Sequence, residues 1–177
     1  MRKTNLHLEK ISWENYVKVL KLRVTKEQEN FVASNKASLI HAFLEMSEGT
    51  KVHSFAVKNG KTVVGFMQLM YSKDWTGEER EDWLNSDEYK QHEGKPYYYI
   101  WRFMIDKKYQ GRGYGKETFK QTLDFIKTFP CGEAEYVLLS YDPNNEVGRK
   151  LYSSFGFKEV FKEYLHEGDE VHALLTL

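Results

Sequence analysis

Hydrophobic and polar residues alternate along the chain in blocks of different period, and these blocks predict its secondary structure. Short apolar runs bounded by turn residues indicate strands, whereas apolar positions repeated at three- and four-residue steps indicate helices. We expect helices after a Ser12 cap, from Ser38 to Gly49, from Gly115 to Pro130 and over 145–154. The predicted apolar face of the second helix carries Leu39, Ala42, Phe43 and Met46, and that of the last carries Val147, Leu151 and Phe155. We expect strands at residues 5–11, 51–57, 62–71, 97–105, 135–141, 157–165 and 170–177.

The runs at 51–57 and 62–71 are joined by Lys58-Asn59-Gly60-Lys61. Asn-Gly between two apolar runs is the strongest short signal for a β-hairpin, so these two strands should be antiparallel neighbours. The strand from Tyr97 should pair next. Strands and helices alternate after this hairpin, which favours a mixed α/β sheet.

The rest of the chain is organised around residues 97–129. A buried strand leads into a loop, and three glycines follow at alternate positions, Gly111, Gly113 and Gly115. A helix begins there, with apolar positions at Phe119, Leu123, Ile126 and Phe129. A strand, a glycine turn and a helix start in this order can form an anion site.

The first amides of a helix lack internal partners, and the helix dipole adds about half a positive charge there. Glycines let a phosphate approach the backbone, and Arg112 and Lys116 add positive charge. Residues 110–116 are therefore predicted to bind a phosphate or pyrophosphate. A glycine turn that only closes a strand–helix corner remains the alternative. The spacing matches neither the Walker nor the dinucleotide pattern.

The pattern Gln110-x-x-Gly113-x-Gly115 resembles the acetyl-coenzyme A motif of the GNAT family, the GCN5-related N-acetyltransferases. The block from Asn145 to Phe157, which contains Leu151-Tyr152-x-x-Phe-Gly-Phe, resembles the late helix and strand of that family. The two blocks stand in the expected order. The segment Glu27–Phe31 further resembles the early substrate-side region of bacterial spermine/spermidine acetyltransferases.

The resemblance implies one acetyltransferase domain over residues 1–177 with acetyl-CoA as cosubstrate. It implies a mixed, mostly antiparallel seven-stranded α/β (α+β) sheet, about four helices, and a splay between the fourth and fifth strands. By resemblance, the main-chain groups of three strand residues contact the pantetheine arm of acetyl-CoA: Phe103, Met104 and Ile105. The loop that wraps the pyrophosphate comprises Gln110, Gly111, Arg112, Gly113, Tyr114, Gly115 and Lys116. Asn145 forms a hydrogen bond near the pantetheine arm.

Acetyl transfer to an amine moves two protons. An alkyl ammonium has a pKa near ~10.4, so about one in ~10³ is neutral at pH 7, and the departing thiolate needs a proton. Tyr152 matches the tyrosine general acid of many family members, although it could instead be a buried tyrosine that packs helix against sheet.

The general base is less evident, because the central strand carries Arg102 and no glutamate. Asp106 follows that strand as a turn former. Glu29 is the candidate for binding the substrate ammonium, and Tyr141 and Asp142 are further groove candidates.

Composition narrows the function classes. The chain has 177 residues, 41% of them hydrophobic, and equal numbers of basic and acidic residues, 26 each. The absence of a basic excess argues against nucleic-acid binding. Cys131 is the single cysteine, the six histidines show no metal spacing, and no run approaches the ~18 apolar residues of a membrane span. We expect no metal, no membrane association and a cytoplasmic location.

Residues 73–96 hold eight acidic and four basic side chains with interleaved aromatics. This segment is either an acidic flap that attracts a polyamine or a solvated helical insertion. The sequence as a whole predicts an N-acetyltransferase for a primary amine of a small molecule, foremost spermidine or spermine. An aminoglycoside, an amino acid, a protein N-terminus, or a non-catalytic acyl-CoA-binding module are the alternatives, and a homodimer is possible.

Overall fold

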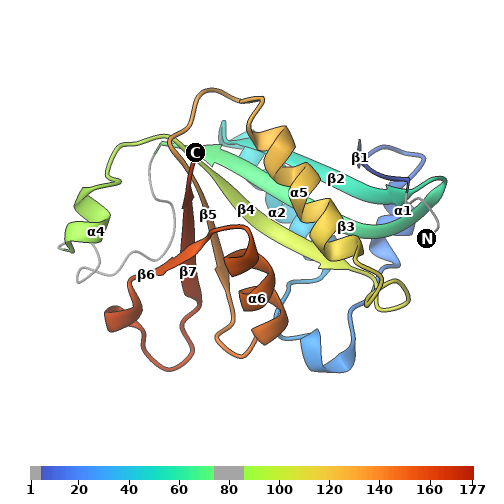
Figure 1. Ribbon diagram of the computed structural model, residues 1–177. Helices are drawn as coiled ribbons and strands as arrows, with labels where there is room; N and C mark the ends of the chain where they lie inside the picture. Colours follow the sequence, from blue (N-terminus) through green and yellow to red (C-terminus); the bar gives the residue numbers. More distant parts are fainter. Residues whose placement is uncertain (1–4, 74–85) are drawn as a thin grey trace. The chain divides into compact units, whose positions relative to one another are not determined.

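The computed structural model describes residues 5–73 and 86–177, and in this part of the chain seven strands form a sheet of order β1-β2-β3-β4-β5-β7-β6 (Figure 1). The strands are β1 (Leu6–Lys10), β2 (Lys51–Asn59), β3 (Thr62–Ser72), β4 (Tyr97–Ile105), β5 (Tyr136–Tyr141), β6 (Lys158–Val160) and β7 (Val171–Thr176). The helices are α1 (Tyr16–Leu20), α2 (Asn35–Ser47), α4 (Asp87–Lys90), α5 (Tyr114–Ile126) and α6 (Glu146–Ser154), with the short 3₁₀ helices η1 (Lys26–Gln28) and η2 (Lys162–Tyr164).

The strand pairing confirms a mixed sheet that is mostly antiparallel. β1 and β2, β5 and β7, and β6 and β7 pair antiparallel, whereas β4 and β5 are parallel. The parallel pairing runs from Tyr97–Tyr136 to Ile100–Leu139, although β4 continues to Ile105. Pairing over only the first part of β4 is consistent with the expected splay between the fourth and fifth strands.

Two compact units make up the chain. One comprises Met1–Met70 and Trp101–Pro130, and the other comprises Tyr71–Ile100 and Cys131–Leu177, so β4 contributes to both. The first unit has a buried cluster formed by Val19, Leu22, Ala56, Val63, Phe66 and Met104. The second has its own cluster of Tyr97, Tyr136, Leu138 and Leu174. A single functional domain over residues 1–177 stays a prediction.

The first helices begin at other residues than the sequence predicts. Helix α1 begins at Tyr16, and Ser12 caps the turn that leads into it: its hydroxyl accepts from the Glu14 amide at 3.3 Å, while the Asn15 side chain accepts from the Ser12 amide at 2.9 Å. Helix α2 begins at Asn35, three residues before the predicted Ser38, because the Ser34 hydroxyl caps it by accepting from the Ala37 amide.

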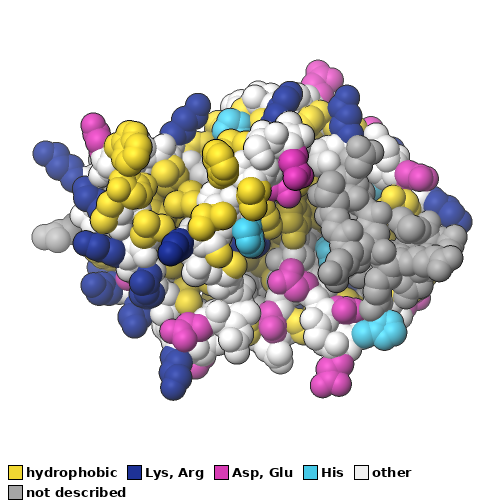
Figure 2. Space-filling model, turned by 180° about the vertical axis from the view of Figure 1, so that it is seen from behind, with side chains coloured by type: hydrophobic (Ala, Val, Ile, Leu, Met, Phe, Trp, Pro, Cys, Tyr) yellow, Lys and Arg dark blue, Asp and Glu magenta, His cyan; other side chains and the backbone are white. Residues whose placement is uncertain are grey.

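Helix α2 presents a partly apolar surface to solvent. The predicted apolar face included Phe43 and Met46, yet these side chains are 66% and 50% exposed. Ile40 and Leu44 on the same helix and Trp13 before α1 are also exposed. Figure 2 shows hydrophobic side chains gathered on this side of the molecule. The inward side of α2 carries Ala42, which is buried as predicted, Leu39, which packs against the core cluster of the first unit, and the buried polar residues Asn35 and Ser38.

Three further predictions, for β6, for the end of α5 and for Val147, differ from the structure. Strand β6 covers only three residues of the predicted 157–165, because Phe161 adopts φ +58° and turns the chain into η2. Helix α5 ends at Ile126, and Phe129 lies beyond it with φ +51°, outside the right-handed helical region. Val147, expected on the apolar face of α6, is 72% exposed.

The acidic segment at 73–96 is only partly described. Residues 74–85, which include Trp75 and Trp83, lie outside the described residues, and so does most of the proposed flap. The remaining part forms α4, capped by Ser86, and the Glu88 carboxylate accepts from the Phe161 amide at 2.8 Å. No helix within residues 5–73 and 86–177 has the length and apolar character needed to cross a membrane.

Candidate active site

A turn built on Asp106 connects β4 to the glycine loop. Asp106 is buried, and its two carboxylate oxygens accept from the backbone amides of Arg23 and Lys108, both at 2.9 Å. The bond to Lys108, two residues along, forms an Asx turn, as expected for this residue. Asp106 therefore sets the direction in which the loop leaves the strand.

Gln110, the first residue of the motif, anchors the loop from inside. Its side-chain amide donates to the Ile105 carbonyl and to the Gln28 side-chain oxygen, both at 2.9 Å. The first bond ties the loop to the end of β4, and the second ties it to η1. Because Gln110 already engages the Ile105 carbonyl, the main-chain contact predicted there for pantetheine would rely on the amide or on neighbouring residues.

The loop needs glycine for its backbone conformation rather than for lack of space. Gly111 and Gly113 adopt φ +72° and +78°, a region that L side chains rarely enter. A Cβ atom at either position would meet no protein atom within 4 Å. The two residues thus leave an open approach to the backbone at the start of α5.

The first turn of α5 has the features of an anion site. Gly113 occupies the cap position without a side chain to satisfy the first amides, so those amides and the helix dipole face outward. Arg112 and Lys116 are exposed beside them, with the Arg112 guanidinium 5.6 Å from the Tyr109 ring centroid. This geometry supports a phosphate loop over a plain corner turn.

Neighbouring side chains are used to hold the loop and strand in place. The Tyr114 hydroxyl accepts from Asn59 at 2.8 Å, and the Phe103 ring packs edge-on against Phe119 with centroids 5.5 Å apart. Both side chains are thus packed or bonded within the protein, and the Tyr114 hydroxyl keeps its own hydrogen as a donor. Glu29 follows η1 as an exposed carboxylate, one residue after Gln28.

In the second unit, Asn145 caps α6. Its side-chain oxygen accepts from the Gly148 amide at 2.9 Å, which leaves the amide nitrogen as a donor. The helix carries Tyr152, which is 9% exposed and lies 5.3 Å from the Tyr141 ring and 6.4 Å from the Phe157 ring. Burial first, and then the charges of Tyr141, Glu170 and Tyr99, raise the pKa of Tyr152. The phenol is therefore fully protonated near neutral pH.

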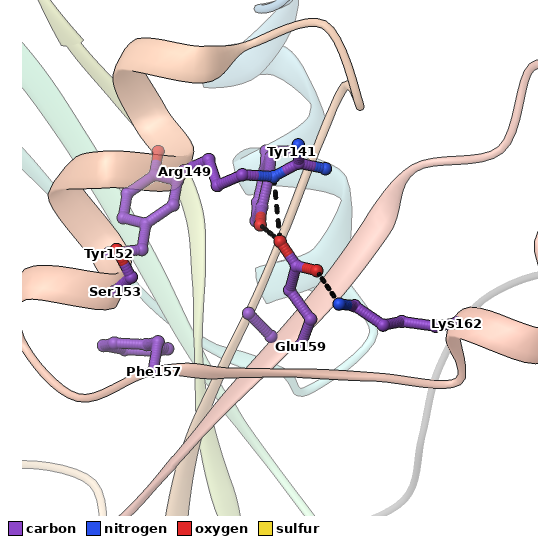
Figure 3. Close-up of a pocket in the computed structure, with 8 residues that line it drawn as sticks. Tyr141, Arg149, Tyr152, Ser153, Phe157, Glu159 and Lys162 are labelled. Atoms are coloured by element: carbon purple, nitrogen blue, oxygen red, sulfur yellow. Dashed lines mark hydrogen bonds and ion pairs between the residues drawn. The ribbon is translucent and has the colours of Figure 1, made fainter.

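A cavity of about 170 Å³ lies beside Tyr152 (Figure 3). Glu159 connects the polar side chains that line this cavity. This carboxylate accepts from the Tyr141 hydroxyl at 2.7 Å and pairs with Arg149 at 2.9 Å and Lys162 at 2.6 Å. The residues lining the cavity come from β5, α6, the β6 region, η2 and β7: Tyr141, Arg149, Tyr152, Ser153, Phe157, Glu159, Lys162 and Ala173.

The hydrogen bonds set the protonation states of the polar side chains that line this cavity. Burial, and next the bond to Glu159, raise the pKa of Tyr141 to about 12. Burial alone would raise the pKa of Glu159, but the hydrogen bonds from Lys162 and Tyr141 and the positive charges of Lys162 and Arg149 outweigh it and lower that pKa. The network is thus a charged carboxylate held by two cations and a neutral phenol.

The sequence reading missed this network. Glu159, Arg149 and Lys162 belong to no recognisable motif. The predicted antiparallel pairing of the last two strands was the one signal that pointed to their proximity. In residues 5–73 and 86–177, no group of three or more His, Cys, Asp or Glu side chains is placed to hold a metal ion.

Comparisons with known proteins identify the family. The structure of a spermidine N-acetyltransferase from Vibrio cholerae, with CoA and spermine, matches at a TM-score of 0.63 and 14% identity, over 97% of this chain and 95% of the other. A PaiA N-acetyltransferase from Thermoplasma acidophilum, with coenzyme A, matches at 0.60 and 14%, over 97% and 99%. NAA60 of Arabidopsis thaliana, with a bisubstrate analogue, matches at 0.62 and 15%, over 97% and 99%.

A search of curated protein sequences gave no significant match. The family model described as acetyltransferase (GNAT) family, however, matches residues 10–157. That range contains the glycine loop, the start of α5, Asn145 and Tyr152. The chain belongs to the GNAT acetyltransferase family and is an acyltransferase that uses acetyl-CoA.

Proposed function

We propose that this GNAT acetyltransferase transfers the acetyl group of acetyl-CoA to a primary amine of a polyamine such as spermidine or spermine. The observation that carries the proposal is the hydrogen bond between Gln28 and Gln110, which fixes η1 beside the glycine loop. Glu29 directly follows η1, so an exposed carboxylate stands at the edge of the acetyl-CoA loop. A carboxylate there suits a substrate with several ammonium groups.

Cofactor binding is divided between main-chain and side-chain groups. The amides of the first turn of α5 would bind the pyrophosphate, with Arg112 and Lys116 adding positive charge. Backbone groups of 103–105 would pair with the pantetheine arm, and the Asn145 amide would donate to it. The open space over Gly111 and Gly113 supports this assignment.

Tyr152 would act as the general acid. Acetyl transfer leaves a thiolate, and a positioned phenol can give it a proton. The raised pKa of Tyr152 keeps the phenol in its protonated form near neutral pH, so the hydroxyl carries the proton that the step requires. Its packing against Tyr141, whose hydroxyl is held by Glu159, fixes the ring.

The substrate class is tested with a panel of acceptors. Thiol release from acetyl-CoA should be fastest with spermidine and spermine, slower with short diamines, and slow with aminoglycosides, amino acids and a peptide N-terminus. Glu29→Gln should raise KM for spermidine about tenfold. Glu48→Gln, an exposed carboxylate at the end of α2, is the matched control. Faster turnover of a peptide or aminoglycoside contradicts the polyamine assignment.

The general acid is tested separately. Tyr152→Phe should lower turnover at least tenfold while the Kd for acetyl-CoA stays close to the wild-type value. Tyr164→Phe in η2 removes a phenol of the same unit outside the cavity lining and serves as the control. Unchanged turnover in Tyr152→Phe would remove Tyr152 from the mechanism. Acetyl-CoA binding without turnover on any amine would favour a non-catalytic module. A homodimer and a cytoplasmic location stay predictions.

A further inference from the structure

Three oxygen-bearing side chains from neighbouring strands form a hydrogen-bonded chain in the second unit. The Tyr99 hydroxyl and the Ser140 hydroxyl are 2.6 Å apart, and Ser140 donates to the Glu170 carboxylate. Because Ser140 gives its proton to Glu170, it must accept from Tyr99. The chain therefore has one direction, from the Tyr99 phenol through Ser140 to the carboxylate.

The strand register explains why these residues meet. Tyr99 of β4 stands opposite Leu138 of β5, two residues before Ser140. Ser140 stands opposite His172 of β7, two residues after Glu170. Residues two apart share a face of a strand, so Tyr99, Ser140 and Glu170 lie on one face along a diagonal.

This chain lies where the parallel pairing of β4 and β5 ends. The last pair is Ile100–Leu139, and Tyr99 and Ser140 directly flank it. Tyr141, the next residue after Ser140, faces the other side of the sheet and packs against Tyr152. The charges of Glu170 and Tyr99 also act on the Tyr152 phenol, so the two groups of side chains are near each other.

The charge of Glu170 is not compensated by a basic side chain in the described part of the chain. Its exposed carboxylate accepts a hydrogen bond from the neutral hydroxyl of Ser140. Around it stand Tyr99 on β4, Tyr152 on α6, Asp169 beside it and His172 on β7. Burial lowers the pKa of His172, so that imidazole is neutral near pH 7. The surroundings of Glu170 thus hold acids and neutral groups, which favours a cationic ligand.

We propose that Glu170, assisted by the Tyr99 and Ser140 hydroxyls, binds the reacting ammonium group of the acceptor and takes up its proton. The inference rests on the proposed N-acetyltransferase function and supplies the base that β4, with Arg102 and no glutamate, lacks.

The proton and electron balance is complete. The ammonium R–NH₃⁺ gives one proton to the Glu170 carboxylate, which releases it to solvent because it is exposed. The nitrogen lone pair forms the C–N bond with the thioester carbonyl carbon, and the C–S bond breaks with its electron pair on sulfur. A second nitrogen proton leaves through the Glu170 carboxylate to solvent. Tyr152 protonates the sulfur and regains a proton from solvent. The products are the acetamide, the free thiol and one proton.

The test compares Glu170→Gln with wild type over pH 7 to 10, using spermidine and acetyl-CoA. At pH 7, kcat/KM for spermidine should fall at least tenfold, while the Kd for acetyl-CoA is unchanged. The defect should shrink toward pH ~10, where the amine is neutral without help from a base. Tyr99→Phe should show a smaller defect with the same pH trend. Glu167→Gln, an exposed carboxylate of the same β6–β7 connection, should match wild type throughout.

Two results overturn the inference. One is a Glu170→Gln enzyme as active as wild type at pH 7, and the other is a defect of equal size at every pH, which indicates a structural role. A different result contradicts the proposed function: wild-type protein that acetylates none of the amines. That result would also contradict the inference about Glu170.

Discussion

Gly65→Ala is the substitution whose effect can be derived most directly from the structure. Gly65 lies in β3, and a Cβ atom there would stand 2.6 Å from the Met104 carbonyl oxygen and 2.8 Å from the Ile105 Cδ1 atom. The Ile105 side chain can rotate away from the added Cβ atom, but the Met104 carbonyl belongs to the backbone of β4 and cannot. Relieving the contact requires a shift of roughly half an ångström in one of the two strands.

The expected loss of stability follows from that clash. Overpacking of a core costs about 1–3 kcal/mol, and Ala regains about 0.4–1 kcal/mol by restricting the unfolded chain. The net free energy of unfolding should fall by about 1–2 kcal/mol, which lowers Tm by about 3–8 °C for a chain of this size. A displaced Met104–Ile105 backbone should also weaken acetyl-CoA binding about fivefold, the equivalent of one hydrogen bond.

Thermal unfolding followed by circular dichroism and calorimetric titration with acetyl-CoA measure the two effects. Gly115→Ala is the matched control for stability, because its Cβ would lie 4.0 Å from the nearest atom outside its own turn, in ordinary contact. Its Tm should stay equal or rise, since Ala favours a helix over Gly. A Gly65→Ala protein with wild-type Tm would refute the idea that β3 and β4 are too close for a side chain.

Three further changes probe the site. Glu159→Gln should destabilise the protein by about 1–2 kcal/mol at pH 7. Because the folded pKa of Glu159 is lowered, its contribution is fully present above pH ~4.5 and is lost as the pH falls through the folded value, so urea titrations should show a smaller gap at pH 3.5 than at pH 7. Gly148→Ala places a Cβ 2.7 Å from the Asn145 amide nitrogen and should displace that cap, costing about 1 kcal/mol in thermal unfolding. Gly113→Asp should abolish acetyl-CoA binding through strain and repulsion, and a normal Kd would refute the phosphate-loop assignment.

Local signals in the sequence predict the elements that depend on local physics. Asn59-Gly60 marks the β2–β3 turn, and the apolar run from Tyr97 marks β4 with its observed ends. The glycines at 111 and 113 take the left-handed conformations for which glycine is suited. Each of these outcomes is decided within a few residues, so the sequence carries the information.

Expectations that depended on packing were less accurate. Periodicity placed Phe43 and Val147 on buried faces, but both are exposed, because a helical stripe shows which residues lie together and not which stripe faces the core. The short β6 likewise follows from the turn at Phe161, whose amide is held by Glu88 from another part of the chain.

Side-chain clusters across strands are the hardest features to predict, since they depend on register. Tyr99, Ser140 and Glu170 are separated by 41 and 30 positions and belong to no shared motif. A shift of one residue in either pairing would turn one member to the opposite face and break the chain. A motif search finds the part of a GNAT site that binds the cofactor, because phosphate recognition is local. The groups that we propose to bind the acceptor, Tyr99, Ser140 and Glu170, come together only through the pairing of β4, β5 and β7, so no local pattern marks them.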